Sequence, residues 1–372
     1  YMASMILLCG TLIVFAQLSF MRSQSLGVKT NQTLVVKFPG HTEGLNTKLE
    51  AMKKTIARLP LVYQVTFSGA VPGEEVATFL SNRRTNDALK QNRLYEMLAC
   101  DPDYVDAYGL QVVAGRNFSE DYGDDVDKLV INETAVRNLG FTSNDEAIGE
   151  LVNVECTDAP MQIIGVVKDY HQQALSKNYT PIMLIHKDKI AWLPQRYISI
   201  VMTSGDPREL VSQVHEIWNQ YFADSSFDYF FLDQFFDHQY RQDEVFGVMI
   251  GAFTGLAIFI SCLGLWVLVM FSCSTRTKEM GIRKVLGASR WTLFYQLVKG
   301  FFLLILIAVV IALPLAWFSM NAWLSHYAFR TDLKAWFFIV PVLLMLFISF
   351  VTVAFQTMKI IMSKPARSLR YE

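Results

Sequence analysis

Charged residues are scarce in this sequence, at 18% of 372 residues, whereas an ordinary soluble domain carries about 25%. Four stretches have no charged side chain, and each has the roughly 20 residues that are needed to cross a bilayer core. The scarcity of charge therefore excludes a single soluble globule. It predicts a membrane α-helical protein with spans at residues 1–21, 245–272, 292–320 and 335–358.

Cysteines are also few, and their positions restrict what they can do. Cys9, Cys262 and Cys273 fall in or beside the expected spans, where cysteine usually serves as a small packing residue. An oxidising compartment would permit a disulfide between the other two, Cys100 and Cys156. The sequence does not place their Cα atoms within bonding range, so this pairing stays open. No CxxC or mixed Cys/His spacing indicates zinc, and no cofactor is predicted.

Catalytic and nucleotide-binding signatures are absent as well. The six histidines are scattered, and neither HExxH nor GxSxG occurs, so the sequence predicts a protein that is not an enzyme. No GxxxxGK[ST] occurs either, so ATP would have to be bound by a partner subunit. A basic stripe interleaved with stacking aromatics is lacking, which excludes nucleic acid as a partner.

Two acidic groups are open to a metal-binding interpretation. The run from Glu120 to Asp127 lacks the alternating ligands and terminal glutamate of an EF-hand loop, so a solvated loop is favoured. Asp233, Asp237 and His238 are expected on a helix that leads to the second span. A solvated helix face is favoured there too.

Charge is distributed unevenly between the spans and the segment that separates the first two. Residues 21–244 contain 31 acidic and 21 basic side chains, and the rest of the chain has a net charge of +9. Cytoplasmic loops collect Lys and Arg. The basic segments 273–291 and 359–372 are therefore predicted in the cytoplasm, and the acidic domain of residues 22–244 outside.

The extracytoplasmic domain is predicted to be α+β, with two strand-helix-strand units at its ends. The first unit covers Thr33 to Ser68, and the second covers Tyr197 to Leu232, where Asp206 caps a helix that has Pro207 in its first turn. Two such units predict a split, ferredoxin-like layer. The residues between them, about 70–195, are expected to form an inserted α+β subdomain with a small twisted sheet.

The approach to the second span carries two further patterns. Residues 235–244 run into the span without Pro or Gly, which suggests one continuous helix that transmits motion, although sequence patterns alone slightly favour a mere connector. Within the span, Gly247, Gly251 and Gly255 share one helix face. This spacing permits close packing against a paired permease half or a second copy, although glycine is common in membrane helices anyway.

The segment RTKEMGIRKVLGA, residues 276–288, is the most informative motif. Its residues predict a basic amphipathic cytoplasmic helix with Glu279 and Arg283 paired at i,i+4. A juxtamembrane helix on anionic lipid headgroups is the simplest interpretation. Gly281 and Gly287 weaken a helix by about 1 kcal/mol each relative to alanine, so they indicate close approach to another surface.

This motif, with the following span and the final KPARSLRYE, resembles the FtsX-like permease module of MacB-type ABC transporters. The stretches AGRNFSEDY (114–122) and IIGVVKDYH (163–171) resemble the external domain of that family. The similarity extends over essentially the whole chain. It is greatest to the second half of duplicated eight-span permeases, so we expect the chain to be a fragment of a longer permease.

The resemblance implies a permease in the bacterial inner membrane that pairs with an ABC ATPase subunit and works by mechanotransmission. Its external domain would be a porter part interrupted by an insert, and it would drive an external export or extraction step. Further implied partners are a second permease half or a homodimer, and a periplasmic adaptor. A four-span MacB usually bears its ATPase on the same chain, and these 372 residues contain none. By motif match, the residues that contact the ATPase are Arg276, Glu279, Gly281, Arg283, Lys284 and Gly287.

A membrane receptor with an extracytoplasmic ligand-sensing domain is the alternative. A receptor would carry an effector domain after its second span, but here two more spans and a short tail follow. A membrane-anchored external enzyme is disfavoured by the lack of catalytic motifs.

Overall fold

The computed structural model divides into two compact units. The helical unit contains residues 1–23 and 241–372, and the α/β unit contains residues 24–240. The structure describes residues 1–30, 32–39, 45–86, 91–119, 125–174, 177–190, 192–193, 195–275, 283 and 290–361.

Among the described residues, four helices are long and apolar enough to cross a membrane. Their exposed side chains are largely apolar, as those of Phe253, Leu303 and Phe347 show, and such surfaces suit contact with lipid tails. An α-helix satisfies its own backbone hydrogen bonds, which a bilayer requires. The four helices are α1 (Met2–Ser23), α7 (Leu232–Thr275), α9 (Arg290–Leu324) and α10 (Trp336–Ile361).

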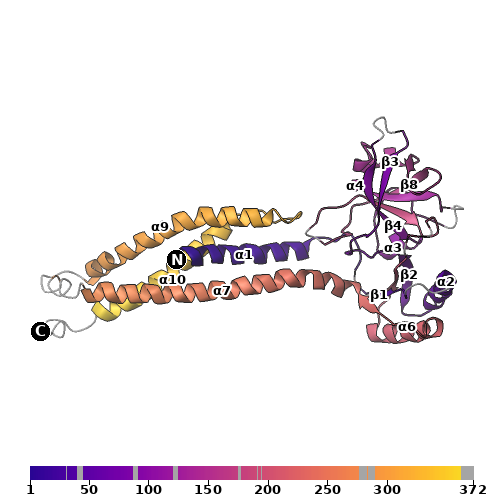
Figure 1. Ribbon diagram of the computed structural model, residues 1–372. Coiled ribbons are helices and arrows are strands. Elements are labelled where there is room, and N and C mark those ends of the chain that lie inside the picture. The colour runs from indigo at the N-terminus through magenta and orange to yellow at the C-terminus, as the bar shows by residue number, and fades with distance from the viewer. Residues whose placement is uncertain are drawn as a thin grey trace. The chain divides into compact units, whose positions relative to one another are not determined.

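Helix α7 confirms the continuous helix that the sequence predicts across residue 244. It begins at Leu232, still within the α/β unit, and continues unbroken to Thr275 (Figure 1). Asp233, Asp237 and His238 lie exposed on its first turns, as expected of a solvated face.

One part of the α/β unit, the strand layer, consists of four strands and two helices. The neighbouring strands of this layer are all antiparallel, in the order β11-β1-β10-β2. Helix α2 follows β1 and helix α6 follows β10, so each element lies where the sequence predicts it. The bounds are β1 (Thr33–Lys37), α2 (Leu45–Ile56), β2 (Val62–Ser68), β10 (Tyr197–Met202), α6 (Pro207–Tyr221) and β11 (Tyr229–Phe231).

Both helices of the strand layer pack on the same face of the strands (Figure 1). Apolar residues recur at helical spacing, such as Leu49, Met52 and Ile56 in α2, and they are buried against the sheet. Asp206 accepts a hydrogen bond from Arg208 N and so caps α6, which confirms the predicted start of that helix.

The insert is a closed barrel rather than the expected small twisted sheet. Strand β9 pairs in parallel with β4, and this pairing closes a ring of six strands. Closure removes the exposed edges that an open sheet would present. In ring order the strands are β4 (Arg93–Cys100), β3 (Phe79–Arg84), β7 (Leu151–Asn153), β8 (Met161–Val167), β6 (Lys128–Asn132) and β9 (Ile182–His186).

Shorter elements complete the barrel. Strand β5 (Val112–Gly115) pairs with β8, and the helices α3 (Tyr104–Ala107), α4 (Glu133–Asn138) and α5 (Asn144–Ala147) lie in its connections. Asn132 and Ser143 cap α4 and α5 through their side-chain oxygens. Cys100 is buried and Cys156 is exposed, and both are free thiols, so the structure contradicts a disulfide between them.

A buried ion cluster joins the barrel to the strand layer. Asp101, which follows β4 and is 1% exposed, accepts hydrogen bonds from Thr66 Oγ1 at 2.5 Å and from Phe67 N at 2.9 Å. Lys53 of α2 donates to Asp101 at 2.6 Å and to Asp103 at 2.5 Å. Because a buried charge needs partners, this cluster fixes α2, β2 and the end of β4 to one another.

We expect Asp101→Asn to lower the free energy of unfolding of this region by about 2 kcal/mol, because charge-assisted hydrogen bonds to Lys53 and Thr66 are lost in a buried site. Asp103→Asn is the matched control, since its side chain is 44% exposed and the loss should stay below about 1 kcal/mol. Hydrogen exchange of the β2 amides in the detergent-solubilised chain measures both. Equal protection in the two variants would contradict a stabilising role for the cluster.

Candidate functional site

The predicted ATPase-contacting segment lies almost wholly outside the described residues. Arg283 is described, as a helical and exposed residue. The other five predicted contact residues fall outside the described part of the chain, namely Arg276, Glu279, Gly281, Lys284 and Gly287. Their role stays a prediction.

The first turns of α7 are anchored in the core of the α/β unit. Leu232, Phe236 and Tyr240 recur every four residues and are all buried, and the first two belong to that core. The ring of Phe236 packs on Gly73, where a Cβ would lie only 2.7 Å from the ring. Gly73 also has φ +89°, a backbone conformation that favours glycine. The side-chain amide of Gln239 donates to Gly73 O at 2.7 Å.

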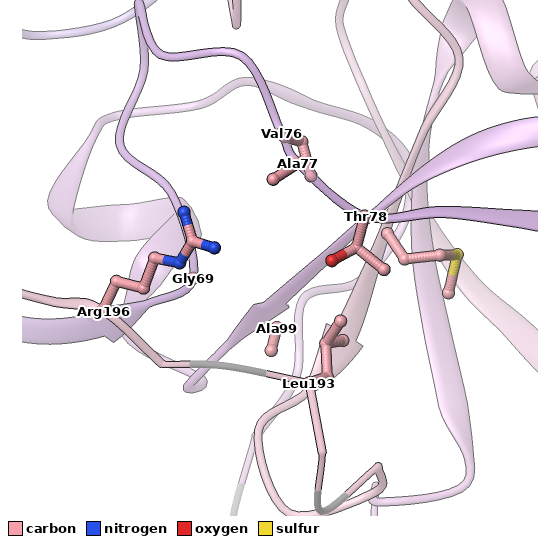
Figure 2. Close-up of a pocket in the computed structure, with 8 residues that line it drawn as sticks. Gly69, Val76, Ala77, Thr78, Ala99, Leu193 and Arg196 are labelled. Atoms are coloured by element: carbon pink, nitrogen blue, oxygen red, sulfur yellow. The ribbon is translucent and has the colours of Figure 1, made fainter. Parts of the chain in front are cut away.

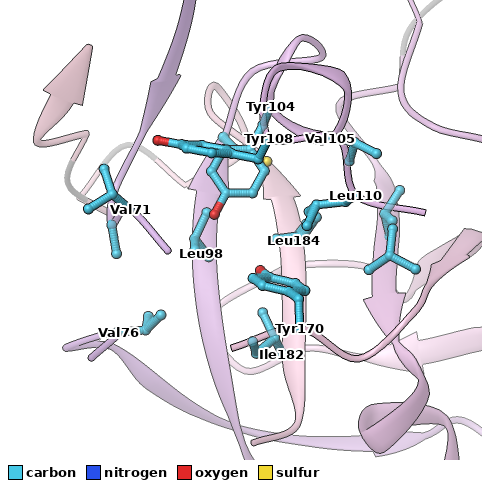
Figure 3. Packing of buried hydrophobic residues seen from close by; sticks show 14 of the residues in the cluster. Val71, Val76, Leu98, Tyr104, Val105, Tyr108, Leu110, Tyr170, Ile182 and Leu184 are labelled. Atoms are coloured by element: carbon cyan, nitrogen blue, oxygen red, sulfur yellow. The ribbon is translucent and has the colours of Figure 1, made fainter. Parts of the chain in front are cut away.

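Three tyrosines form the centre of this core (Figure 3). Tyr104, Tyr108 and Tyr170 are fully buried, and burial raises the pKa of each phenol well above its usual range. Tyr108 donates its hydroxyl hydrogen to Ser199 Oγ at 2.7 Å and so ties the core to β10. Neutral, packed phenols of this kind serve as structure rather than as acid-base groups.

The chain segment that follows α1 attaches to the same core. Lys29 N donates to Tyr108 O at 2.8 Å, and His171 N donates to Leu26 O at 3.0 Å. Both chain connections that lead to the helical unit, residues 24–30 and the start of α7, therefore end in one cluster of buried residues.

A small notch lies where the barrel meets the strand layer (Figure 2). Arg196 and Thr78 line it from opposite sides, and Leu193 and Ala99 lie at its base. Its volume of about 10 Å³ holds no more than a single water molecule. The notch is too small for a substrate.

Of the acidic run that was considered for calcium, Glu120, Asp121 and Asp124 lie outside the described residues, and Asp125 and Asp127 have basic partners. Asp125 forms a two-point ion pair with Arg116 at 2.7 and 2.8 Å, and these hydrogen bonds lower the pKa of its carboxyl group. Asp127 pairs with Lys189. Among the described residues, no group of three or more His, Cys, Asp or Glu side chains is arranged to hold a metal ion.

In the helical unit, small polar residues form a seam between α1 and α7. Ser4 Oγ lies 2.7 Å from Ser261 Oγ and donates to Ala257 O at 3.1 Å. Thr11 Oγ1 and Thr254 Oγ1 lie 2.8 Å apart. Small residues allow close helix approach, and hydroxyl pairs across a membrane interface each contribute about 1 kcal/mol.

The three predicted packing glycines are not equivalent. A Cβ on Gly247 would lie 3.4 Å from both Val14 and Leu18 of α1, and Gly251 also faces α1, near Thr11. Gly255 has no described atom within 4 Å of its Cβ position. Two of the three therefore face the first helix of the same chain, and packing against a second copy stays a prediction.

Sequence reasoning missed Gln17, which holds the connection between α9 and α10. Gln17 is 1% exposed, and its Nε2 donates to Phe329 O at 2.8 Å while its Oε1 accepts from Thr331 N at 2.8 Å. Tyr327 of the same connection donates to Asp243 Oδ1 of α7 at 3.1 Å. A lone amide in an apolar stretch was the available signal, because polar groups inside membranes need partners.

We expect Gly247→Leu to separate α1 from α7, because the added side chain would overlap Val14 and Leu18. The readout is disulfide formation between Ser4→Cys and Ser261→Cys in a chain with Cys262→Ser. Gly247→Leu should reduce the cross-linked fraction severalfold, whereas the control Gly255→Leu should leave it unchanged. An undiminished cross-link in Gly247→Leu would contradict the seam.

The buried His171 should make the α/β unit sensitive to acid. Burial lowers the pKa of its imidazole from 6.5 to about 4 in the folded state. The unfolded state therefore takes up the proton first, so stability present above pH 6.5 is lost as the pH falls towards 4. His171→Phe, which can still stack on Tyr179, should flatten the decline in melting temperature between pH 7 and 5. The exposed His215→Phe should not, and equal slopes would refute the assignment.

Comparison with known proteins gives two matching family models. The MacB-like periplasmic core domain matches residues 3–217, and the C-terminal part of FtsX-like permeases matches residues 251–365. The solved structures that resemble the chain include the periplasmic region of MacB from Actinobacillus actinomycetemcomitans, with 16% identity, TM-score 0.40 and coverage of 57% of this chain and 94% of that one. The extracellular domain of YknZ from Gram-positive bacteria has 16% identity, TM-score 0.37 and coverage of 53% and 97%.

Curated relatives are distant in sequence. The chain is 22% identical to the uncharacterized ABC transporter permease YvrN of Bacillus subtilis (strain 168), covering 54% of this chain and 52% of that protein. It is 24% identical to the macrolide export ATP-binding/permease protein MacB of Sodalis glossinidius (strain morsitans), covering 54% and 32%. The chain thus spans about half or less of the length of the curated relatives it matches. Because the two family models together cover both of its units, the chain belongs to the FtsX-like permeases of ABC transporters that carry a MacB-like periplasmic core domain.

Proposed function

We propose that this permease works with a separate ABC ATPase subunit in the bacterial inner membrane and transmits ATP-driven movement to its periplasmic domain. One observation carries the proposal. Helix α7 is a single helix that is anchored in the periplasmic core at Leu232 and Phe236 and is described as far as Thr275, directly before the predicted ATPase-contacting segment.

The geometry of α7 suits this role. At 1.5 Å per residue, its 44 residues extend about 66 Å, enough to cross a bilayer and continue beyond it. Unbroken backbone hydrogen bonds make a helix stiff along its axis, so displacement of one end moves the other. No proline lies within α7, whereas α9 contains Pro314 and α10 contains Pro341.

Packing within the helical unit would allow α7 to shift. The apolar window of α7 is 17% buried, whereas that of α1 is 56% buried. Side chains such as Phe259 and Val267 are exposed along α7. A lipid-facing helix that is held by a narrow seam can be displaced without repacking a core.

The proposal also includes an assignment of the parts of the periplasmic domain. We assign the periplasmic domain to residues 22–244, the strand layer to a ferredoxin-like porter part and the barrel to the insert at about 70–195. The strand order β11-β1-β10-β2, with helices after β1 and β10, supports the ferredoxin-like assignment. A second permease half or copy, a periplasmic adaptor and an exported or extracted substrate complete the proposed system.

Purification from native membranes tests the partner. An ABC ATPase should accompany the full chain, and Glu279→Lys should weaken that association, because it reverses a charge in the predicted contact segment. If no ATPase is recovered with the unaltered chain, the transporter proposal fails.

Breaking α7 tests the transmission. Val245 is exposed within the helix, so Val245→Pro removes a backbone hydrogen bond at a cost of about 3 kcal/mol without loss of packing. In the reconstituted complex, we expect ATP hydrolysis within twofold of the unaltered rate but loss of the ATP-dependent change in hydrogen exchange of the periplasmic domain. Val245→Ala should retain both. An intact exchange response in Val245→Pro would refute transmission through α7.

A further inference from the structure

We propose that Gln239 and Gln172 are positioning residues that hold one loop, residues 71–74, between α7 and the barrel, and that movement of α7 reaches the barrel through this loop, whereas the strand layer is joined to α7 directly at Leu232. The inference rests on the proposed function and deepens it. Its substance is a chain of hydrogen bonds within the periplasmic domain, and each bond has a named donor and acceptor.

The loop is first joined to α7. Gln239 Nε2 donates to Gly73 O at 2.7 Å, and the Phe236 ring lies on the face of Gly73 that has no side chain. The helix therefore holds Gly73 by a polar and an apolar contact at once. Axial displacement of α7 would move the carbonyl of Gly73 with it.

Gln172 holds the same loop from the opposite part of the chain. Its Nε2 donates to Val71 O at 2.8 Å and to Glu74 O at 3.0 Å, and the residue is 2% exposed. One amide thus spans the loop with both of its hydrogens. The bond to Val71 O is buried, so this carbonyl has no ready substitute partner if the amide is removed.

From Gln172 the contacts continue to the barrel. The adjacent Gln173 donates to Glu96 Oε1 of β4 at 2.6 Å, and Glu96 is almost fully buried. Burial raises the pKa of the Glu96 carboxyl group, in keeping with a surrounding that disfavours charge. The segment 171–173 is therefore bound to the barrel wall on one side and to the loop on the other.

From the loop the contacts also continue to the strand layer and to the segment after α1. Tyr197 of β10 donates its hydroxyl hydrogen to Glu74 Oε1 at 2.8 Å. Gly73 N donates to His171 O at 3.3 Å, and His171 N donates to Leu26 O at 3.0 Å. The loop is thus the place where α7, both subdomains and the segment after α1 are linked by hydrogen bonds.

Directional hydrogen bonds suit such a role better than apolar contact. Apolar surfaces slide over one another at little cost, whereas a buried amide that loses its acceptor leaves both groups unsatisfied. Between α7 and the loop, the part-buried bond from Gln239 to Gly73 O and the Phe236 ring on Gly73 together hold one register.

The test uses the full chain reconstituted with its ATPase and measures hydrogen exchange with and without ATP. Gln239→Met keeps an unbranched side chain of similar size but lacks the donor. We expect the ATP-dependent exchange change to fall at least fivefold in residues 71–74 and β4, with ATP hydrolysis within twofold of the unaltered rate. Gln239→Arg, which restores an N–H donor, should recover at least half of the response. The control is Gln234→Met, at an exposed position on the same helix.

Gln172→Met tests whether movement passes from the loop to β4, because it should separate the responses of these two segments. Since Gln239 still holds Gly73, residues 71–74 should respond to ATP as before while the response of β4 falls at least fivefold. Gln220→Met, on the exposed face of α6, should change neither. A general loss of structure would not separate the loop from β4 in this way.

Two outcomes overturn the inference. A full response of β4 in Gln239→Met would show that the loop is bypassed. An equal loss of response in the loop and in β4 of Gln172→Met would show that movement does not pass from the loop to β4 through Gln172. If Val245→Pro abolishes the response while Gln239→Met retains it, transmission through α7 stands and only the positioning role fails. If Val245→Pro retains the response, the proposed function itself fails.

Discussion

Helix α7 is one continuous helix in two environments, a protein core at its start and an apolar surrounding along its later part. The rest of the structure is arranged around that requirement. Between Leu232 and Tyr240 its buried face meets a protein core, and beyond Val245 its surface is apolar and largely exposed. A break between these regions would leave backbone groups unpaired near the membrane surface. Continuity of the helix therefore keeps its backbone paired, and it is the physical basis of the transmission that we propose.

Three parts of the molecule are held by different kinds of polar contact, and the kind of contact corresponds to how rigidly each part is held. An ion cluster around Asp101 joins α2 to the barrel, where fixed geometry is needed. Neutral amides hold the loop at Gly73, where burial disfavours charge. Hydroxyl pairs such as Thr11 with Thr254 join α1 to α7, where a weaker contact suffices. This gradation places the most readily broken contacts along the helix that we propose to move.

Sequence reasoning succeeded where structure is local. The four spans, the unbroken α7 and the strands and helices of the strand layer follow from hydropathy, helical spacing and a capping Asp206, all of which act within a few residues. It failed for the barrel, which closes through pairing of β4 with β9, two strands far apart in the chain. It also failed for Gln17 and Gln172, because the hydrogen-bond partners of these side chains lie far away in the sequence and no local pattern identifies them.

The sequence by itself determined the membrane character of this protein, and it predicts the side on which the acidic domain lies and, through the motif after Thr275, the partner class. These depend on composition and order alone, since lipid and water act on each segment separately. Only the tertiary structure decided that Gly247 faces α1 while Gly255 does not, and that Gly73 has no room for a side chain. Those facts depend on which surfaces meet, and contact between distant segments is a property of packing that no local pattern contains.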